Sequence, residues 1–523
     1  MPQFATNTQL PRYLRVEQER IEKIARSHGL DFFPTVFEML SYDQMNEVAA
    51  YGGFPNRYPH WRFGMEYERL SKSYEYGLSK IYEMVINNNP SFAYLLEGNS
   101  LTDQKLVMCH VFGHVDFFKN NFTFRATDLD AVDPVTDPVR QRGDGYDPNR
   151  KWVDKMANHG AAIRRIVDRY GIHKVEEFVD VCLSLENLID PWSRFVVRRR
   201  PEVGEEDHPT EVVVPRLRAK EYLDDFINPQ EYIDEQKKKL EDERDKKKGK
   251  FPSHREQDIL QFLIENAPLE RWERAILSIT REEGYYFVPQ MQTKIMNEGW
   301  ASYWHSKMMT GGHVCDFSEI IDYADNNAGV MATSGGRLNP YKLGVELFRS
   351  IEERWNKGQF GPEWQECDDL DEKRHWDLRL GLGRDKIFEV RALYNDVTFI
   401  DEFLTEDFAI ENKLFTYAWS NRNERFEIES REFRNIKEKL LSQLTNFGSP
   451  FIYIEDANWE NRGELLMMHE HRGVDLRSDY ARETMASMVR VWKRPVCLAT
   501  IIDGKKALLR YDGKEHSVRH DAP

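Results

Sequence analysis

The spacing of hydrophobic residues changes once along this chain, near residue 414, and this change constrains the fold more than any other feature. Between residues 8 and 200, apolar residues recur at the three- and four-residue spacing typical of helices that bury one face. Beyond residue 414, apolar stretches of strand length alternate with helical stretches. The sequence therefore predicts an α+β protein, with a large, mostly α-helical N-terminal domain and a smaller C-terminal α+β module of strand–strand–helix repeats.

In the N-terminal part, helices are expected wherever a cap or a break bounds a helical stretch. Gly29 ends the first helix, and Ser100 or Thr102 caps the fourth. The expected helices cover residues 9–28, 34–50, 65–87, 102–119, 151–170 and 174–187, and further ones cover residues 258–266, 269–283 and 292–309. Residues 125–150 are rich in Asp, Pro and Gly, which predicts an exposed loop.

Three strand pairs are expected in the C-terminal module, and a helix follows each of the first two. The pairs cover residues 414–419 with 425–428, 451–455 with 464–469, and 496–502 with 507–511, and the helices cover 432–444 and 480–492. Asp503-Gly504 separates the last two strands and is typical of a tight hairpin turn.

Changes in composition predict five consecutive segments. They are a helical domain (1–200), a charged connector (201–257), a helical segment that completes the candidate metal site (258–345), a helical or irregular bridging segment (346–412) and the α+β module (413–523). Within the connector, residues 231–250 hold 7 acidic and 8 basic residues, which favours a solvated helix or a mobile connector over a binding tail.

The overall charge argues against several classes of partner. Lys and Arg number 73 and Asp and Glu number 89, which gives a net charge of −16. Nucleic acid is therefore not an expected partner, because non-specific binding to it requires a basic surface. The chain has no apolar stretch of about 18 residues and no signal-peptide pattern at its start, so neither a membrane span nor export is expected. Its 5 cysteines form no C-x-x-C pair, which fits a cytoplasmic location.

Two histidines of one predicted helix provide the first half of a candidate metal site. In His110-Val-Phe-Gly-His114 the two imidazoles are four residues apart, so they share one helix face and can bind a single cation. Apolar neighbours on both sides indicate that they are buried. A second such pair, His516 and His520, lies in a polar tail. The alternative is a pair of core histidines bonded to carboxylates or backbone carbonyls.

Glu298 and His305 provide the second half. They are seven residues apart, two helical turns, and therefore point from one face of the predicted helix over residues 292–309. Small residues between them allow another helix to approach closely. Two imidazoles and a carboxylate are the ligands of many zinc hydrolases. The alternative is that Glu298 forms a surface ion pair beside a packed aromatic stripe.

These residues predict a site in which His110, His114 and Glu298 bind one divalent metal ion. His305 is then a fourth ligand or an acid–base group. Where H-E-x-x-H hydrolases carry their general base, this chain has Val111. Candidates for a base by residue type alone are Glu38, Glu47, Glu66 and His159. Without a base, the cation would be structural, bind a substrate or activate oxygen.

An aromatic, basic loop is a candidate for substrate binding. Arg57, His60 and Arg62 bring two guanidinium groups and an imidazole together with Tyr58 and Trp61. Such a loop can hold an anionic or sugar-like substrate through bidentate hydrogen bonds and stacking. The alternative is an aromatic loop that simply packs on the helices.

Several longer motifs resemble those of a known family. They are Asp31-Phe-Phe-Pro-Thr-Val-Phe-Glu38, Tyr51-Gly-Gly-Phe-Pro55, Trp61-Arg-Phe-Gly-Met-Glu66, Leu95-Leu-Glu-Gly-Asn99, His110-x-x-Gly-His114-Val-Asp-Phe-Phe118, Asn297-Glu-Gly-Trp-Ala-Ser-Tyr-Trp-His305, Arg391-Ala-Leu-Tyr-Asn-Asp-Val-Thr-Phe-Ile-Asp-Glu-Phe-Leu404 and Asn461-Arg-Gly-Glu-Leu465. Together they resemble the SpoVR (stage V sporulation protein R) family, over residues 10–511. Residues 125–150 look like an insertion relative to that family.

The resemblance implies a physiological setting more than a reaction. It implies a role in forming the spore cortex, a modified peptidoglycan, or in stationary-phase and stress physiology. It also implies a PrkA-like serine kinase and a von Willebrand-type protein as partners. No established catalytic residue comes with it.

The residues and the resemblance together predict a cytoplasmic SpoVR-like protein with one divalent metal ion, zinc favoured over iron. If the protein is an enzyme, we expect metal-assisted hydrolysis of an amide or peptide bond, with Glu298 and His305 as the catalytic candidates. One alternative is a non-enzymatic scaffold or regulator that acts with a serine kinase. The other is a non-haem iron protein, which uses the same two-histidine, one-carboxylate ligand set.

Overall fold

The structure, a computed structural model, describes most of the chain. The described residues are 10–75, 83–125, 127, 151–193, 229–247, 250–311, 314–331, 339–420 and 425–520. Most of the loop expected over residues 125–150 lies outside them, so that expectation stays a prediction.

The chain divides into two compact units, and each is built from two separate stretches of sequence. The first unit comprises Met1–Ile172 and Tyr285–Gly448, and the second comprises His173–Gly284 and Ser449–Pro523. The five consecutive segments expected from composition stay a prediction; the compact units follow a different division. The α+β class is confirmed, because most elements are helical and a five-stranded sheet lies near the C-terminus.

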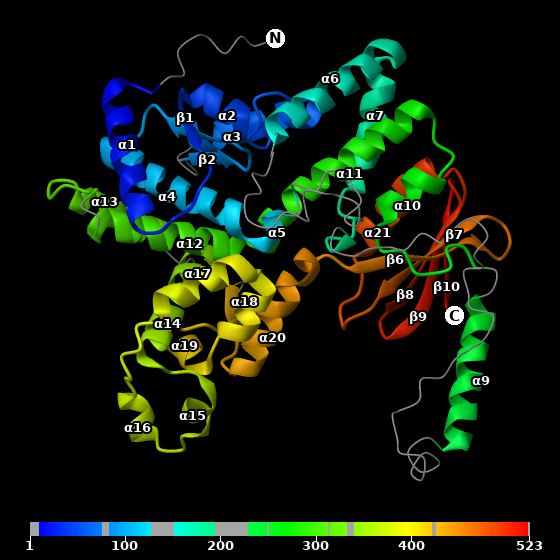
Figure 1. The fold of residues 1–523 in the computed structure, drawn as a ribbon. Helices are drawn as coiled ribbons and strands as arrows, with labels where there is room; N and C mark the ends of the chain where they lie inside the picture. The colour runs from blue at the N-terminus through cyan, green and yellow to red at the C-terminus, as the bar shows by residue number, and fades with distance from the viewer. Residues whose placement is uncertain are drawn as a thin grey trace. The chain divides into compact units, whose positions relative to one another are not determined.

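The first unit is dominated by helices (Figure 1). They are α1 (Arg12–Ser27), α2 (Tyr42–Ala50), α3 (Trp61–Glu75), α4 (Leu101–Asn120), α5 (Phe122–Arg125), α6 (Trp152–Tyr170), α12 (Lys294–Ser306), a π-helical turn (Lys307–Gly311), α13 (Ile320–Val330), α14 (Pro340–Lys357), α15 (Gly361–Glu366), α16 (Leu370–His375), α17 (Gly383–Leu393), α18 (Asp396–Phe403), α19 (Glu406–Glu411) and α20 (Phe433–Leu444). Helix α11 (Arg271–Gln292) belongs partly to each unit.

A three-stranded sheet in the first unit corrects two of the expected helices. Its strands are β1 (Thr35–Leu40), β2 (Glu83–Ile86) and β3 (Ser91–Leu96), in the order β1-β3-β2. The helix expected over residues 34–50 is wrong in its first part, because Thr-Val-Phe favours extended backbone and Ser41 caps a helix that begins only at Tyr42. The helix expected over 65–87 is wrong in its last part, because residues 83–86 form β2, whereas α3 is described as far as Glu75.

Helices α4, α12 and α14 pack so closely that their backbones touch. A Cβ atom on Gly113 of α4 would lie 2.7 Å from the Cα atom of Ala301, and one on Gly299 would lie 2.5 Å from backbone atoms of Gly344. Large aromatic side chains fill the space around these contacts, among them the fully buried Trp300 and Trp304. Glycine is therefore needed at these crossings because no side chain fits between the helices.

The second unit contains a five-stranded sheet with helices. Its strands are β6 (Phe451–Trp459), β7 (Glu464–Glu470), β8 (Val496–Ile502), β9 (Lys505–Tyr511) and β10 (His516–His520), and its helices include α7 (Ile172–Ser184), α9 (Gln230–Lys247), α10 (Ile259–Asn266) and α21 (Ser478–Trp492). The order is β10-β9-β8-β7-β6, with only β7 and β8 parallel among these neighbours.

Two details of the C-terminal module differ from expectation. The strands β4 (Thr416–Ser420) and β5 (Arg425–Ser430) pair as expected but form a sheet of their own in the first unit. Strand β10 was not expected, because all five of its residues are exposed and carry no apolar alternation. It contains His516 and His520.

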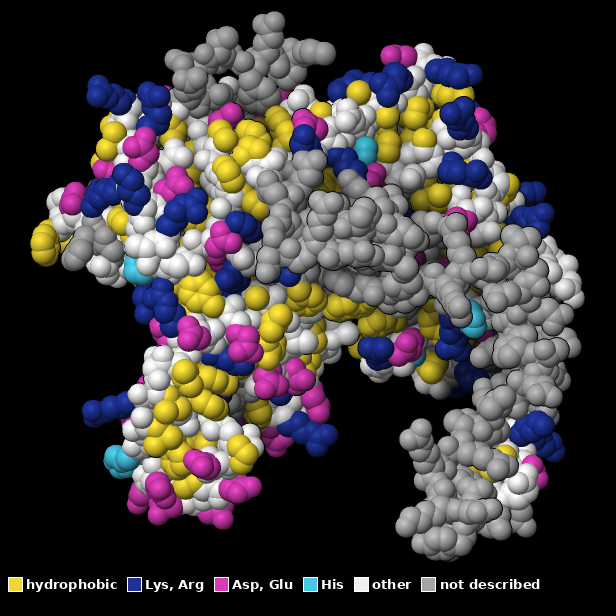
Figure 2. All heavy atoms as spheres, in the orientation of Figure 1, with side chains coloured by type: hydrophobic (Ala, Val, Ile, Leu, Met, Phe, Trp, Pro, Cys, Tyr) yellow, Lys and Arg dark blue, Asp and Glu magenta, His cyan; other side chains and the backbone are white. Residues whose placement is uncertain are grey.

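The surface of one part of the first unit is strongly acidic. Figure 2 shows Asp and Glu side chains gathered over α15 and α16. The exposed acidic residues there include Glu363, Glu366, Asp368, Asp369, Asp371 and Glu372.

Among the helices of the described residues, none combines the length and the apolar character needed to cross a membrane.

Candidate metal centre

Helix α4 carries both histidines of the H-x-x-x-H motif on its buried face. Ser100 starts the helix with a capping box, in which its side chain and that of Asp103 each accept a hydrogen bond from the other's backbone N–H. The helix then runs through the core, so that His110 is 3 % exposed and His114 is 4 % exposed. Burial of both imidazoles confirms the expectation from their apolar neighbours.

Helix α12 carries Glu298, and a carboxylate from another helix fixes its start. Asp396 of α18 accepts hydrogen bonds from the backbone N–H groups of Ile295 (2.8 Å) and Met296 (2.9 Å). The N–H groups in the first turn of a helix have no acceptor within the helix itself, and an acidic side chain is a favourable acceptor for them. Glu298 follows one turn after this anchor.

Direct contacts hold α4 and α12 side by side (Figure 1). The indole N–H of Trp300 donates to Asp116 of α4 at 2.8 Å. Arg391 of α17 forms a buried ion pair with the same carboxylate at 3.3 Å. Burial raises the pKa of Asp116 to about 6, although Arg391 acts in the opposite direction. The close approach at Gly113 and these bonds together bring Glu298 to the two histidines.

The three side chains converge on one point. Glu298 Oε2 lies 3.5 Å from His110 Nε2 and 3.5 Å from His114 Nε2. One ligand atom from each residue lies within 4.8 Å of the other two. The Oε2 atom is buried, and no described residue donates a hydrogen bond to it within normal distance. Burial opposes ionisation of this carboxyl, but the two imidazoles hold the pKa of Glu298 well below its ordinary value.

This spacing fits a divalent metal ion. Zinc binds imidazole nitrogen and carboxylate oxygen at about 2.0–2.1 Å in tetrahedral geometry, which places neighbouring ligand atoms roughly 3.3 Å apart. The observed 3.5 Å separations are therefore close to those around a bound ion. The nitrogen and oxygen donors also suit iron, so the geometry defines a candidate metal site without fixing the metal.

The rear nitrogens of both imidazoles have neighbours that orient the rings. His114 Nδ1 lies 2.9 Å from Asn297 Oδ1, and His110 Nδ1 lies 2.8 Å from His305 Nδ1. His305 Nε2 lies 3.3 Å from Asn327 Oδ1 of α13. Burial, with a smaller contribution from His110, lowers the pKa of His305 to about 3. His305 is therefore neutral near pH 7 and can accept a hydrogen bond.

Comparison with known proteins identifies the family of this chain. A family profile described as "SpoVR like protein" matches residues 9–449. The chain belongs to the SpoVR family. A relative in Escherichia coli (strain K12), named "Uncharacterized protein YcgB", is 30% identical over 470 residues, which are 82% of this chain and 80% of the relative. No solved structure matches the chain.

Within this SpoVR-family chain, His305 does not join the group of three ligand candidates. The group found among the described residues is His110, His114 and Glu298. His305 lies behind His110 instead. Its expected role as a fourth ligand or acid–base group stays a prediction. Sequence reasoning also gave no role to Asn297, although it directly precedes Glu298, or to Asn327, which no motif marks.

The basic aromatic loop packs against α6. Arg57 Nη1 lies 3.1 Å from Met156 Sδ, and the backbone oxygen of Arg57 accepts a hydrogen bond from Arg164 at 2.9 Å. The His60 ring is buried, and its Nδ1 accepts the backbone N–H of Arg62 at 3.2 Å. A role for Arg57, His60 and Arg62 in substrate binding stays a prediction.

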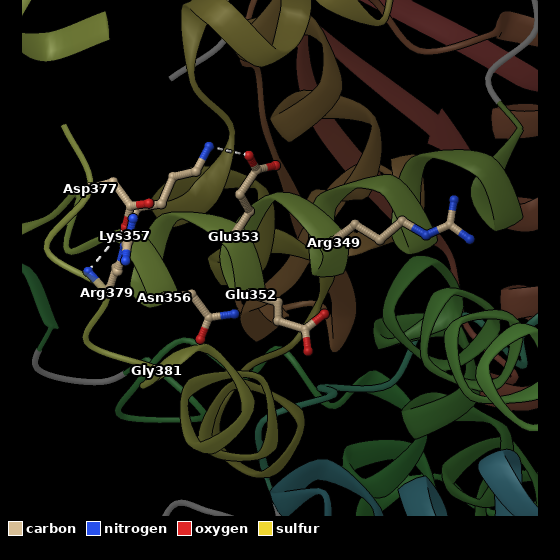
Figure 3. Close-up of a pocket in the computed structure, with 8 residues that line it drawn as sticks. All are labelled: Arg349, Glu352, Glu353, Asn356, Lys357, Asp377, Arg379 and Gly381. Atoms are coloured by element: carbon tan, nitrogen blue, oxygen red, sulfur yellow. Dashed lines mark hydrogen bonds and ion pairs between the residues drawn. The ribbon is translucent and has the colours of Figure 1, made fainter. Parts of the chain in front are cut away.

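An open basin of about 590 Å³ lies along the second half of α14. Figure 3 shows its lining, which mixes acidic and basic side chains: Arg349, Glu352, Glu353, Asn356, Lys357, Asp377, Arg379 and Gly381. Several of these charges already have partners within the protein, since Lys357 pairs with Glu353 and Glu352 accepts the Tyr303 hydroxyl at 2.6 Å. We assign no ligand to this basin.

A methyl group at Gly113 is expected to disturb the metal site. In Gly113→Ala the new Cβ meets Ala301 Cα at 2.7 Å, so α4 and α12 must move apart. Such overpacking lowers the free energy of unfolding by about 1–3 kcal/mol. We expect zinc affinity, measured by chelator competition, to fall about tenfold or more, as when ligand support is lost. An unchanged affinity would show that the close crossing does not position the ligands.

Asp396 makes the stability of the first unit depend on pH. Burial raises the pKa of Asp396 to about 7, although hydrogen bonds from the backbone N–H groups of Ile295 and Met296 act in the opposite direction. An unfolded chain has an aspartate pKa near 3.9, so between roughly pH 4 and pH 7 the folded state keeps a proton that the unfolded state releases. The free energy of unfolding therefore falls as pH rises through this window.

The variant Asp396→Asn removes this titration. Urea unfolding at pH 4.5 and pH 7.5 gives the change in the free energy of unfolding for each protein. We expect the wild type to lose on the order of 2–4 kcal/mol more than the variant between these two values, because each pKa unit corresponds to about 1.4 kcal/mol. Any constant loss from the altered hydrogen bonds cancels in this comparison. Equal changes in both proteins would contradict the assignment.

Proposed function

We propose that this SpoVR-family chain is a metal-dependent hydrolase that cleaves an amide or peptide bond. His110, His114 and Glu298 are the metal ligands, and zinc is favoured over iron. The observation that carries the proposal is the placement of one buried carboxylate oxygen 3.5 Å from the Nε2 atoms of two buried imidazoles.

Three protein ligands favour catalysis over a purely structural role. Structural zinc sites are closed by four protein ligands, whereas catalytic sites keep a position for water or substrate. Zinc with such a position polarises a carbonyl group and lowers the pKa of bound water to about 7. The imidazoles and the carboxylate of this chain would hold the ion, and the Glu298 side chain, 19% exposed, marks the more accessible side of the group.

The family supplies the proposed setting. We propose a substrate with an amide bond in a cell-wall precursor or peptide, in line with the link between sporulating members and the spore cortex. A PrkA-like serine kinase and a von Willebrand-type protein are proposed partners on the same ground.

The proposal is tested by incubating the full chain with cell-wall stem peptides and following amide cleavage by mass spectrometry. We expect cleavage that a chelator abolishes and added zinc restores, and that the variant His110→Ala/His114→Ala lacks. Cleavage unaffected by chelator and by the double variant would overturn the assignment of these ligands. Restoration by ferrous iron and not by zinc would favour the non-haem iron alternative.

A further inference from the structure

We propose that His305 and Asn327 position His110 for metal binding, because their hydrogen bonds fix which nitrogen of His110 carries the hydrogen and which one binds the ion. The inference rests on the proposed metal site and assigns His305 a positioning role in place of a ligand role. Its basis is the juxtaposition of three side chains from α4, α12 and α13, linked by distances of 2.8 Å and 3.3 Å.

The first step concerns the tautomer of His110. Its Nε2 atom faces Glu298, so binding an ion there requires a free lone pair on Nε2. A neutral imidazole then carries its hydrogen on Nδ1. That nitrogen lies 2.8 Å from His305 Nδ1, a normal hydrogen-bond distance. His110 therefore donates to His305 whenever its Nε2 binds a metal.

The second step fixes the tautomer of His305 in turn. Because its Nδ1 accepts from His110, a neutral His305 carries its hydrogen on Nε2. This nitrogen lies 3.3 Å from Asn327 Oδ1, and a side-chain amide oxygen is an acceptor. The donor-to-acceptor direction is thus the same along the whole relay, from His110 through His305 to Asn327. Both nitrogens of His305 are engaged, so it cannot ligate the ion without breaking the relay.

The two ligand histidines are supported differently. Asn297 lies next to Glu298 in sequence, so α12 itself supplies both a ligand and the acceptor for His114. His110 depends in addition on α13, which provides Asn327. Two contacts tie helix α13 to α4. Asn326 of α13 donates a hydrogen bond to Asp103 of α4, and Glu319, the residue before α13, forms an ion pair at 3.0 Å with the buried Lys105 of α4. The relay therefore spans three helices that other contacts already hold in register.

The test uses zinc competition titrations of four full-length proteins. His305→Ala removes the acceptor for His110, and we expect affinity to fall 10- to 100-fold, as is typical when a group behind a ligand is lost. His305→Gln keeps an acceptor oxygen and should stay within about threefold of wild type. Tyr303→Phe is the matched control on α12, since it loses one hydrogen bond to Glu352 and should leave zinc affinity unchanged.

Cobalt spectra separate positioning from ligation. If His305 only positions His110, cobalt-loaded His305→Gln keeps the wild-type d–d bands. If His305 is a ligand, His305→Ala and His305→Gln both lose a nitrogen donor and their bands shift, which overturns the inference. Wild-type affinity in His305→Ala also overturns it. A wild type that binds no metal refutes the proposed function itself, so the two failures are distinguishable.

Discussion

We expect the replacement of Glu298 by glutamine to lower the affinity of this protein for zinc, the metal favoured for the candidate site, by about a thousandfold. Glu298 supplies the oxygen that lies 3.5 Å from both imidazoles, and a neutral amide is a poor zinc ligand. Structural zinc sites in zinc-finger peptides bind the ion with about 10–16 kcal/mol over four ligands, so the loss of one ligand corresponds to roughly 4 kcal/mol at the upper end. Competition with a chromophoric chelator measures the loss directly.

Glu352→Gln is the matched control for this experiment. Its carboxylate belongs to α14 and accepts the Tyr303 hydroxyl, so the substitution removes the same charge close to α12 without touching the ligand group. We expect its zinc affinity to stay within about threefold of wild type. If Glu298→Gln binds zinc as tightly as this control, the carboxylate is not a ligand.

Gly344→Ala is expected to destabilise the first unit more than Gly113→Ala does. A Cβ atom at this position would lie 2.2 Å from the backbone oxygen of Ile295 and 2.7 Å from Gly299 Cα. Both are backbone atoms of α12 and cannot rotate away, so α12 and α14 must separate. Overpacking costs typically 1–3 kcal/mol and occasionally more. We expect a loss of about 3 kcal/mol or more in urea unfolding.

Gly64→Ala provides the comparison for this effect. Gly64 lies inside α3, and nothing within 4 Å would meet an added Cβ atom. Alanine favours a helix interior over glycine by up to about 1 kcal/mol, so this variant should be as stable as wild type or slightly more stable. Similar stabilities of the Gly344→Ala and Gly64→Ala variants would show that α12 and α14 are not packed as closely as described.

The helices that carry the site were predictable because their local signals agree. Helix α4 has a serine cap, a complete apolar pattern and two histidines at one-turn spacing, and its observed bounds differ little from those expected. Glu298 was placed opposite these histidines because small residues beside it allow close packing. The contact of Ala301 with Gly113 of α4 agrees with that reasoning, whereas Gly299 approaches Gly344 of α14.

The position of His305 shows the limit of spacing arguments. Seven residues along a helix keep two side chains on one face but separate their Cα atoms by about 10.5 Å along the axis. In the structure His305 Nδ1 lies 2.8 Å from His110 Nδ1, and its role as a fourth ligand stays a prediction. Asn327, which lies 3.3 Å from the other nitrogen of His305, belongs to α13, and the local sequence does not indicate which helix α13 packs against.

The missed strands have a related cause. The sheet β1-β3-β2 pairs Thr35–Leu40 with Ser91–Leu96, so its stability comes from residues far apart in sequence. In β3 most residues are buried, without the alternation typical of a half-exposed strand. From sequence alone, such a continuous apolar stretch cannot be distinguished from a segment of a buried helix.

Element-resolved metal analysis of anaerobically purified protein tests the central claim most directly. The account predicts close to one zinc or iron ion per chain in the wild type, and little or none in His110→Ala/His114→Ala prepared in parallel. Less than about half an ion per chain in the wild type, with the same content in the double variant, would contradict it.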